Sequence, residues 1–210
     1  AVICDAKGVV ASWGNPEAVI FPRSSAKMIQ ALPLIETGAA DARGLTDRHL
    51  ALACASHEGA DLHVGMAGRW IADLGLTEAD LRCGAHEPDN RAERDRLIRA
   101  GEQPCQLHNN CSGKHSGFVC LGCRRAGGRD LFGFMKGYVQ PDHPVMREVS
   151  DALQNATDFD LRHTARGVDG CSIPTWAAPV RAFARGFARM ASGQGLPSDG
   201  AAAARRIFAA

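Results

Sequence analysis

Three short polar segments hold most of the side chains in this chain whose types and spacing suit covalent or metal chemistry. They are residues 21–27, 109–115 and 168–171. The first carries a serine hydroxyl and a lysine amine three residues apart at a predicted helix start, where both lie on one face. The other two carry two cysteines and a second lysine. Together these residue types indicate a hydrolase with a nucleophile, a base and a metal site.

Ser24 and Lys27 are the candidate nucleophile and base. A lysine accepts a proton only as the free amine, so its pKa must be lowered by burial or by a nearby positive charge. Residues 28–35 are apolar nearly all round a predicted helix, and the positive end of the helix dipole acts in the same direction. We therefore expect Lys27 to take the proton from Ser24. Ser25 is a competing nucleophile, ranked second because it lacks the three-residue spacing to the lysine.

A second hydroxyl lies in the segment Cys54–Gly59, which ends an apolar helical pattern with several polar side chains and a glycine that permits a sharp turn. Ser56 in this segment would relay protons if it lay beside the first pair. Taken alone, the segment is also typical of an ordinary polar helix end. The sequence does not show whether His57 faces Ser56, so the relay depends on the residues around it.

The candidate metal ligands are Cys111, Lys114 and Cys171. Cys111 and Lys114 share one face of a predicted helix start, and Cys171 in an Asp-Gly-Cys turn would complete a three-ligand site with Asp169 as a supporting acceptor. Lysine is a rare ligand because it must be neutral to donate its lone pair, a form that the charge of a metal favours. Unrelated thiols and an exposed lysine are the ordinary alternative.

Other histidines and cysteines leave alternatives open. His108 and His115 are conventional zinc ligands that spacing does not exclude. Cys120 and Cys123 have CxxC spacing, but no second CxxC follows, so we interpret the pair as helix packing. Several of the eight cysteines lie in apolar helical patterns, as buried thiols often do, and we interpret most of the eight as reduced.

Composition limits the class of partner. The chain has 210 residues, 45% of them hydrophobic, and its 24 lysines and arginines nearly cancel 23 aspartates and glutamates. This balance predicts no binding to nucleic acid or to an anionic membrane, and favours a small-molecule substrate. No apolar run is long enough to span a bilayer and no secretory signal is present, so we expect a cytoplasmic protein.

The expected architecture is one α/β domain over residues 1–210. Strands are predicted at 1–4 and 9–13, as a hairpin that needs a larger sheet, and near 162–168. The sequence begins at Ala1 directly in a strand-like run and stops inside a helix-forming stretch with neither a stop signal nor a capping glycine. We therefore expect a domain that is incomplete at both ends. The helix that begins at Ser24 should be kinked or broken at Pro33. Helices are predicted at 24–37, 46–55, 60–74, 114–125, 144–155 and 178–192, with a last one from about 198.

Several polar motifs occur in this chain in a fixed order, which is more specific than any single motif. They are Phe21–Glu58, Arg82–Gly84 with His86, Asn109–Gly117, Asp142–Pro144 and Val168–Thr175. In these segments the chain resembles the asparaginase II family of Ser-Lys amidohydrolases, and the similarity covers most of its length.

The resemblance implies a fold and a reaction. The fold would be similar to serine β-lactamases and glutaminases, with a helical region packed against a mixed α/β region. The reaction would be hydrolysis of L-asparagine to L-aspartate and ammonia. The sequence leaves open whether asparagine or glutamine is preferred. It also leaves open whether the protein forms a homodimer.

The resemblance also implies catalytic roles, with Ser24 as nucleophile, Lys27 as its base and Ser56 as relay hydroxyl. Members of the family carry a second catalytic lysine, paired with the relay serine on a later segment, and this chain has no match to it. We therefore expect a domain truncated at its C-terminus. A rival interpretation is a catalytically inert zinc-binding fragment or paralogue, which an ammonia-release assay would separate from an enzyme. A plain helical interaction domain would leave the polar segments unexplained.

The cofactor implied by the resemblance is zinc. It would be held by Cys111, Lys114 and Cys171, and would orient the substrate without generating the nucleophile. The residues implied to support the site are Arg23, His115 and Asp169.

Overall fold

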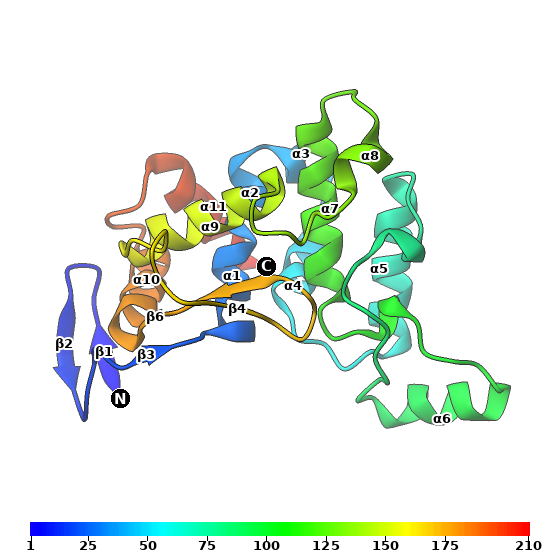
Figure 1. Cartoon of the computed structure of the whole chain (residues 1–210), viewed down its shortest axis with the longest axis horizontal. Helices are drawn as coiled ribbons and strands as arrows, with labels where there is room; N and C mark the ends of the chain where they lie inside the picture. The colour runs from blue at the N-terminus through cyan, green and yellow to red at the C-terminus, as the bar shows by residue number, and fades with distance from the viewer.

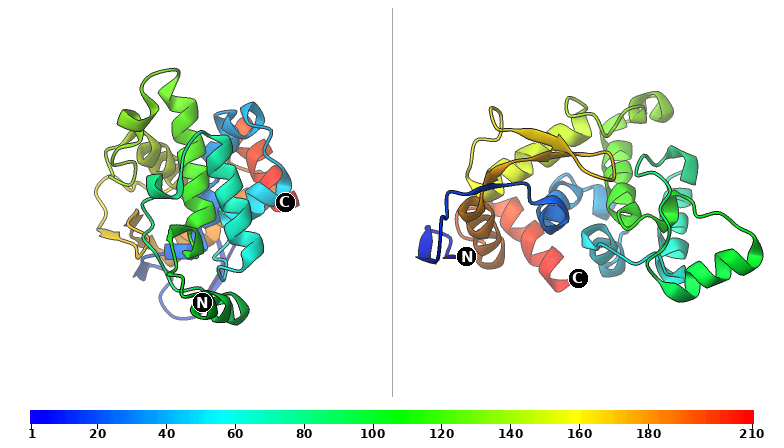
Figure 2. Two further views of the ribbon diagram at one scale, coloured as in Figure 1. Left: turned by 90° about the vertical axis from the view of Figure 1, so that its right-hand side faces the viewer. Right: turned by 60° about the horizontal axis from the view of Figure 1, so that its bottom comes forward.

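The computed structural model describes residues 1–210 as a mixed α/β, mostly helical protein. Two views show an elongated arrangement with the N-terminal hairpin at one end and a surface helix at the other (Figures 1 and 2). The helices are α1 (Lys27–Gln30), α2 (Leu32–Glu36), α3 (Ala39–Ala42), α4 (Asp47–Cys54), α5 (Asp61–Asp73), α6 (Arg91–Ala100), α7 (Ser112–Ala126), α8 (Leu131–Met135), α9 (Pro144–Thr157), α10 (Val180–Ser192) and α11 (Ser198–Ala209).

Six short strands form three separate antiparallel pairs, β1 with β2, β3 with β6, and β4 with β5. The predicted hairpin is present, but the larger sheet expected around it is not. Instead the hairpin contacts α10: the Cys4 thiol lies 3.6 Å from the Arg181 carbonyl, and Arg185 Nε donates to the Ala6 carbonyl at 3.1 Å. A helix therefore supports these strands where further strands were expected. The strands are β1 (Val2–Cys4), β2 (Val9–Ser12), β3 (Val19–Ile20), β4 (Arg166–Val168), β5 (Pro174–Trp176) and β6 (Ala178–Pro179).

The helix predicted from Ser24 is broken into three pieces. A 3-10 turn covers Arg23–Ala26, α1 follows, and the chain bends at Ala31 before α2. Pro33 lies in the first turn of α2, where the missing N–H costs no hydrogen bond. The bend just before this proline confirms the predicted interruption and leaves Lys27 on a short helix of its own.

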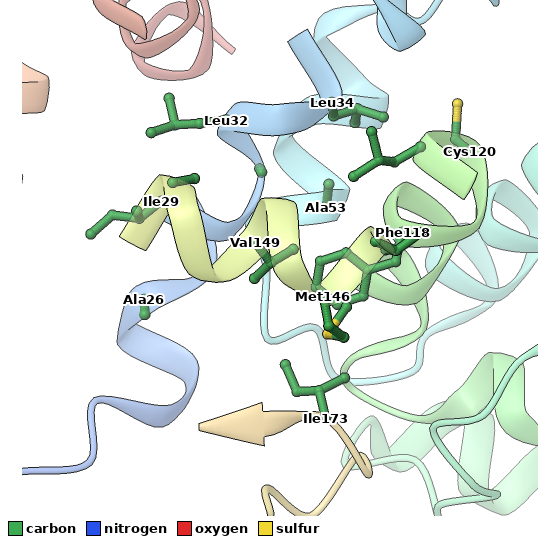
Figure 3. Close-up of a cluster of buried hydrophobic side chains, with 14 of the residues drawn as sticks. Ala26, Ile29, Leu32, Leu34, Ala53, Phe118, Cys120, Met146, Val149 and Ile173 are labelled. Carbon is green, nitrogen blue, oxygen red and sulfur yellow. The ribbon is translucent and has the colours of Figure 1, made fainter. Parts of the chain in front are cut away.

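The core lies where α1, α4, α7 and α9 meet. Side chains from all four helices gather there, with Ile29 from α1, Phe118 from α7 and Val149 from α9 buried together (Figure 3). Ile173, just before β5, closes the cluster from the strand side. This apolar packing fixes the start of α1 against the N-terminus of α7, and those two ends carry the candidate site residues.

The predicted helices from residue 46 onward are confirmed with small changes at their ends. Sequence patterns did not predict α3, α6, α8 or the strands β3, β5 and β6. α6 lies at one end of the molecule and has a largely charged sequence, so it lacks the apolar stripe that marks a packed helix. None of the helices is both long and apolar enough to cross a lipid bilayer. The finer likeness to β-lactamases and glutaminases stays a prediction.

Candidate active site

A strained turn holds Ser24 at the surface. Arg23, the residue before it, has φ of 48°, a left-handed conformation that costs energy for a residue with a Cβ. Its guanidinium Nε donates to Asp169 Oδ1 at 3.0 Å, and the carboxylate is nearly buried. This ion pair ties the Ser24 turn to the loop that carries Cys171. The Ser24 side chain itself is exposed, so a small molecule in solvent can reach it.

The Lys27 amine is buried at the start of α1, with only 1% of the residue exposed. It donates to the Ala55 carbonyl at 2.6 Å, to Ser56 Oγ at 2.9 Å and to the Asn110 carbonyl at 3.2 Å. Burial lowers the pKa of Lys27, and the nearby charge of Lys114 lowers it further, although Cys111 acts in the opposite direction.

Ser24 and Ser56 differ in their contact with the Lys27 amine. Ser56 is in direct contact with it, whereas Ser24 is not among its three oxygen partners. Ser25, the competing nucleophile, donates its hydroxyl hydrogen to the Pro22 carbonyl at 2.6 Å. The lysine and the relay serine are thus brought together, while Ser24 lies one turn away with its hydroxyl free.

Close packing of α4 against α7 brings Ser56 to this point. A Cβ at Gly113 would lie 2.4 Å from the Leu52 carbonyl oxygen, so only glycine permits the two helices to approach this closely. Segment 55–57 leaves α4 and runs past the start of α7, where the His57 amide donates to the Asn110 carbonyl at 3.3 Å. The glycine in the second polar segment therefore has a steric role in assembling the site.

Cys111, Lys114 and Cys171 form a buried group that we call the thiol cluster. Lys114 Nζ donates to Cys171 Sγ at 3.0 Å, and all three residues are buried. The neighbouring Cys171 thiol lowers the pKa of Cys111 to about 5, helped by the charges of Lys114 and Lys27 against the effect of burial. The Cys111 thiol, with burial, raises the pKa of Cys171. Cys111 is therefore the thiol of the pair that ionises more readily.

The donor set suits a soft divalent cation. Two sulfurs and a buried amine are available, and Nε2 of the buried His115 has no hydrogen-bond partner. No group of three or more histidine, cysteine, aspartate or glutamate side chains is placed to hold a metal ion. A site at the thiol cluster would thus use the Lys114 amine as its third ligand.

Of the alternative ligands, His115 lies beside the thiol cluster, whereas His108 and Cys120 lie apart in other contacts. His108 Nδ1 accepts from the Cys105 amide at 3.0 Å, and its Nε2 lies 3.4 Å from Glu93. Cys120 is fully buried in the core, and burial raises its pKa to about 11, so it is inert as a ligand.

His57 is a site residue whose role the sequence did not show. Its Nδ1 accepts the Gly59 amide hydrogen at 3.1 Å, so the neutral ring carries its proton on Nε2, 2.9 Å from Ser112 Oγ. Ser112 in turn donates to the Leu107 carbonyl at 3.0 Å. This chain of hydrogen bonds ties the Ser56 segment to the first residue of α7, next to Cys111.

Acidification should destabilise the protein through His57. Burial, with the charges of His63 and Lys27, lowers the pKa of His57 from 6.5 to about 4. The unfolded chain therefore binds a proton that the folded one does not, and the free energy of unfolding falls as pH drops from about 6.5 to about 4, by at most about 3 kcal/mol. Urea denaturation across this pH range should show that the free energy of unfolding falls less for His57→Gln than for the wild type. The control is His86→Gln at an exposed histidine; equal acid sensitivity of His57→Gln and wild type would contradict the assignment.

No sequence pattern predicted two of the contacts at this site. The carbonyl groups of Ala55 and Asn110 hold the Lys27 amine, and every residue type has such a group. Tyr138, from the segment between α8 and α9, reaches His115 beside the thiol cluster at 2.6 Å. Only the tertiary structure brings these groups to the site.

A comparison with families of known proteins gives a match over the whole chain. The sequence model of a family described as L-asparaginase II matches residues 1–210. No curated protein matches the chain.

Proposed function

Because the chain belongs to the L-asparaginase II family, an amidohydrolase family, we propose that it hydrolyses L-asparagine with Ser24 as nucleophile, Lys27 as base and Ser56 as relay. The family match over the full chain supports the reaction. The observation that carries the catalytic assignment is the buried Lys27 amine with its lowered pKa, 2.9 Å from Ser56 Oγ. Ser24 lies one helical turn before this amine and is open to solvent.

The proposed reaction has two steps. Ser24 Oγ attacks the carboxamide carbon of the substrate side chain, and its proton passes through Ser56 to the Lys27 amine. The carbon–nitrogen bond breaks when the leaving group takes a proton from the Lys27 ammonium and departs as ammonia. Water then attacks the Ser24 ester, which releases L-aspartate and restores the serine hydroxyl.

Zinc fits the thiol cluster as a supporting cofactor. Cys111, Lys114 and Cys171 would hold it, and the bound ion would supply a fixed positive charge that orients the substrate. Arg23 and Asp169 support the same site, since their ion pair fixes the Cys171 loop beside the Ser24 turn. His115 would support it as the neighbour of Lys114 on α7, where its Nδ1 lies 2.6 Å from the Tyr138 hydroxyl.

The alternative is a catalytically inert zinc-binding protein. One observation favours it: Ser24 makes no hydrogen bond with the Lys27 amine, whose three contacts are to other oxygens. Both functions share the thiol cluster and differ only in whether Ser24 reacts.

An ammonia-release assay on the 210-residue chain, with L-asparagine and L-glutamine in parallel, tests the proposed function. Mass spectrometry of the protein mixed with substrate reports a Ser24 ester independently of turnover. Ammonia release or a Ser24 adduct with L-asparagine supports an asparaginase. Neither product, in a folded protein that binds zinc, would establish the inert alternative.

Cys171→Ser should lose zinc. The substitution keeps the size of the side chain but removes one of the two sulfurs, and serine is a poor zinc ligand. Metal analysis of purified protein should find stoichiometric zinc in the wild type and in the control Cys123→Ser, and little in Cys171→Ser. We also expect KM for L-asparagine to rise more than kcat falls, because the ion is assigned to substrate positioning. Unchanged zinc in Cys171→Ser would refute the site and turn attention to His108 and His115.

A further inference from the structure

We propose that Cys105 is a nucleophilic thiol outside the proposed active site that reacts with hydroperoxides, with His108 as its base and Glu93 as the residue that positions this base. Cys105 directly precedes the 3-10 turn Gln106–His108, and its side chain is partly exposed. Its sulfur lies 3.4 Å from His108 Nδ1. Residues 101–103, just before it, are exposed, so a small molecule can reach this segment. A nucleophile, a base and a group that orients the base are therefore close together.

The contacts of His108 fix which ring nitrogen can accept the thiol proton. The ring is buried, with 5% of the residue exposed. Nδ1 accepts the hydrogen of the Cys105 backbone amide at 3.0 Å, so a neutral ring carries its own proton on Nε2. The lone pair of Nδ1 therefore lies on the side of Cys105, within reach of the thiol hydrogen, and can take this proton.

Glu93 of α6 lies on the other side of the ring. Its Oε1 is 3.4 Å from His108 Nε2 without a hydrogen bond between them, and only 6% of the Glu93 side chain is exposed. Arg96 donates to the same oxygen at 2.9 and 3.0 Å, and these hydrogen bonds hold the pKa of Glu93 below its ordinary value. The carboxylate therefore stays charged at neutral pH. Because opposite charges attract, it stabilises the imidazolium that forms when the thiol gives up its proton.

These three side chains are not arranged as a metal site. The sulfur and the carboxylate lie at opposite nitrogens of the ring, so one ion cannot bind all three. No group of three or more histidine, cysteine, aspartate or glutamate side chains is placed to hold a metal. The geometry is instead that of a thiol beside a base whose far side faces an acid.

The other partly exposed cysteines lack this arrangement. They are Cys4, Cys54 and Cys123, and none of them is hydrogen-bonded to a histidine. Burial raises the pKa of each of the three thiols, which makes them poorer nucleophiles. Cys105 is therefore the partly exposed cysteine with a base at hand.

The proposed reaction transfers one oxygen atom to sulfur. His108 Nδ1 takes the thiol proton as the Cys105 sulfur attacks the OH oxygen of a hydroperoxide, and the oxygen–oxygen bond breaks. The sulfur is oxidised to a sulfenic acid, which keeps the OH group of the peroxide. The leaving oxygen takes the proton from His108 and departs as an alcohol, or as water when the oxidant is hydrogen peroxide.

Trapping of the sulfenic acid tests the site in the full-length chain. The protein is treated with hydrogen peroxide and dimedone at pH 7, and mass spectrometry measures the rate of adduct formation at each cysteine. A free thiol is only about 3% thiolate at this pH, so a base can raise the rate by up to about 30-fold. We expect Cys105 to react at least about tenfold faster than Cys4 and Cys123. Equal rates at the three cysteines would overturn the proposal.

His108→Gln separates the base from the cap. The side-chain oxygen of glutamine at this position can still accept the Cys105 amide hydrogen, but it cannot take the thiol proton. We expect adduct formation at Cys105 to slow by about tenfold, with no change at Cys123. A loosened fold would instead make both thiols more reactive. An unchanged rate at Cys105 would show that His108 only caps the turn.

Glu93→Gln removes the charge that faces His108 with little change in size. Glu102→Gln is the matched control, because Glu102 also accepts from Arg96, at 2.9 Å, but is exposed to solvent. We expect the rate at Cys105 to fall by about threefold or more in Glu93→Gln and to stay at the wild-type value in Glu102→Gln. Equal rates in the two variants would contradict the positioning role of Glu93. No asparagine is present in these experiments, so a failure of the proposed asparaginase activity does not affect them.

Discussion

Ser24→Ala is expected to lower kcat/KM for L-asparagine by at least about 10³-fold while the protein stays folded. The attacking oxygen is lost, and a water molecule at the same place lacks the short path to the Lys27 amine. Ser24 is exposed and makes no packing contact that the fold needs, so circular dichroism and the urea midpoint should match the wild type. Ammonia release measures the effect, and the Ser24 ester should be absent from the mass spectrum.

Ser25→Ala is the matched control for this experiment. Ser25 lies next to Ser24 and uses its hydroxyl within the turn, at 2.6 Å from the Pro22 carbonyl. Its removal should leave kcat within about tenfold of the wild type, the size of effect that a lost turn hydrogen bond can cause. Full activity of Ser24→Ala together with an inactive Ser25→Ala would exchange the roles of the two serines.

Lys27→Met is expected to abolish activity to a similar extent, by about 10²–10⁴-fold. Methionine fills the same buried space without a nitrogen, so Ser56 loses its partner and no base remains. Lys27→Arg should be equally inactive, because the guanidinium stays protonated at any accessible pH. Steady-state ammonia release measures both variants, with Lys136→Met at an exposed lysine as the control. Activity retained in Lys27→Arg would show that only a positive charge is needed and would remove Lys27 as the base.

The dependence of kcat/KM on pH should reflect the ionisation of Lys27. The free amine is the active form, so kcat/KM should rise with pH and level off above the pKa of Lys27, which burial holds below its ordinary value of 10.5. Because the folded state binds this proton less readily than the unfolded chain does, stability should also rise with pH between the lowered pKa and 10.5. A profile that rises only above pH 10.5 would contradict the burial effect.

Sequence alone determined the elements that local residue patterns specify. The break near Pro33 follows from a ring that cannot donate a hydrogen bond. The helices from Thr46 onward, except α6 and α8, follow from their apolar periodicity. The order of the motifs determined the family, which the match over residues 1–210 confirms. The three-residue spacing placed Ser24 and Lys27 on one turn, and the long apolar stretch after Lys27 predicted its burial.

Only the tertiary structure decided which polar groups meet. Lys27 contacts Ser56 and two backbone carbonyl groups that no sequence pattern distinguishes. These contacts form because α4 packs closely against α7 at Gly113. Tyr138 joins His115 although 23 residues separate them in sequence. Local spacing fixes neighbours along one helix, but contacts between elements depend on how their apolar faces pack, which is a property of the whole core.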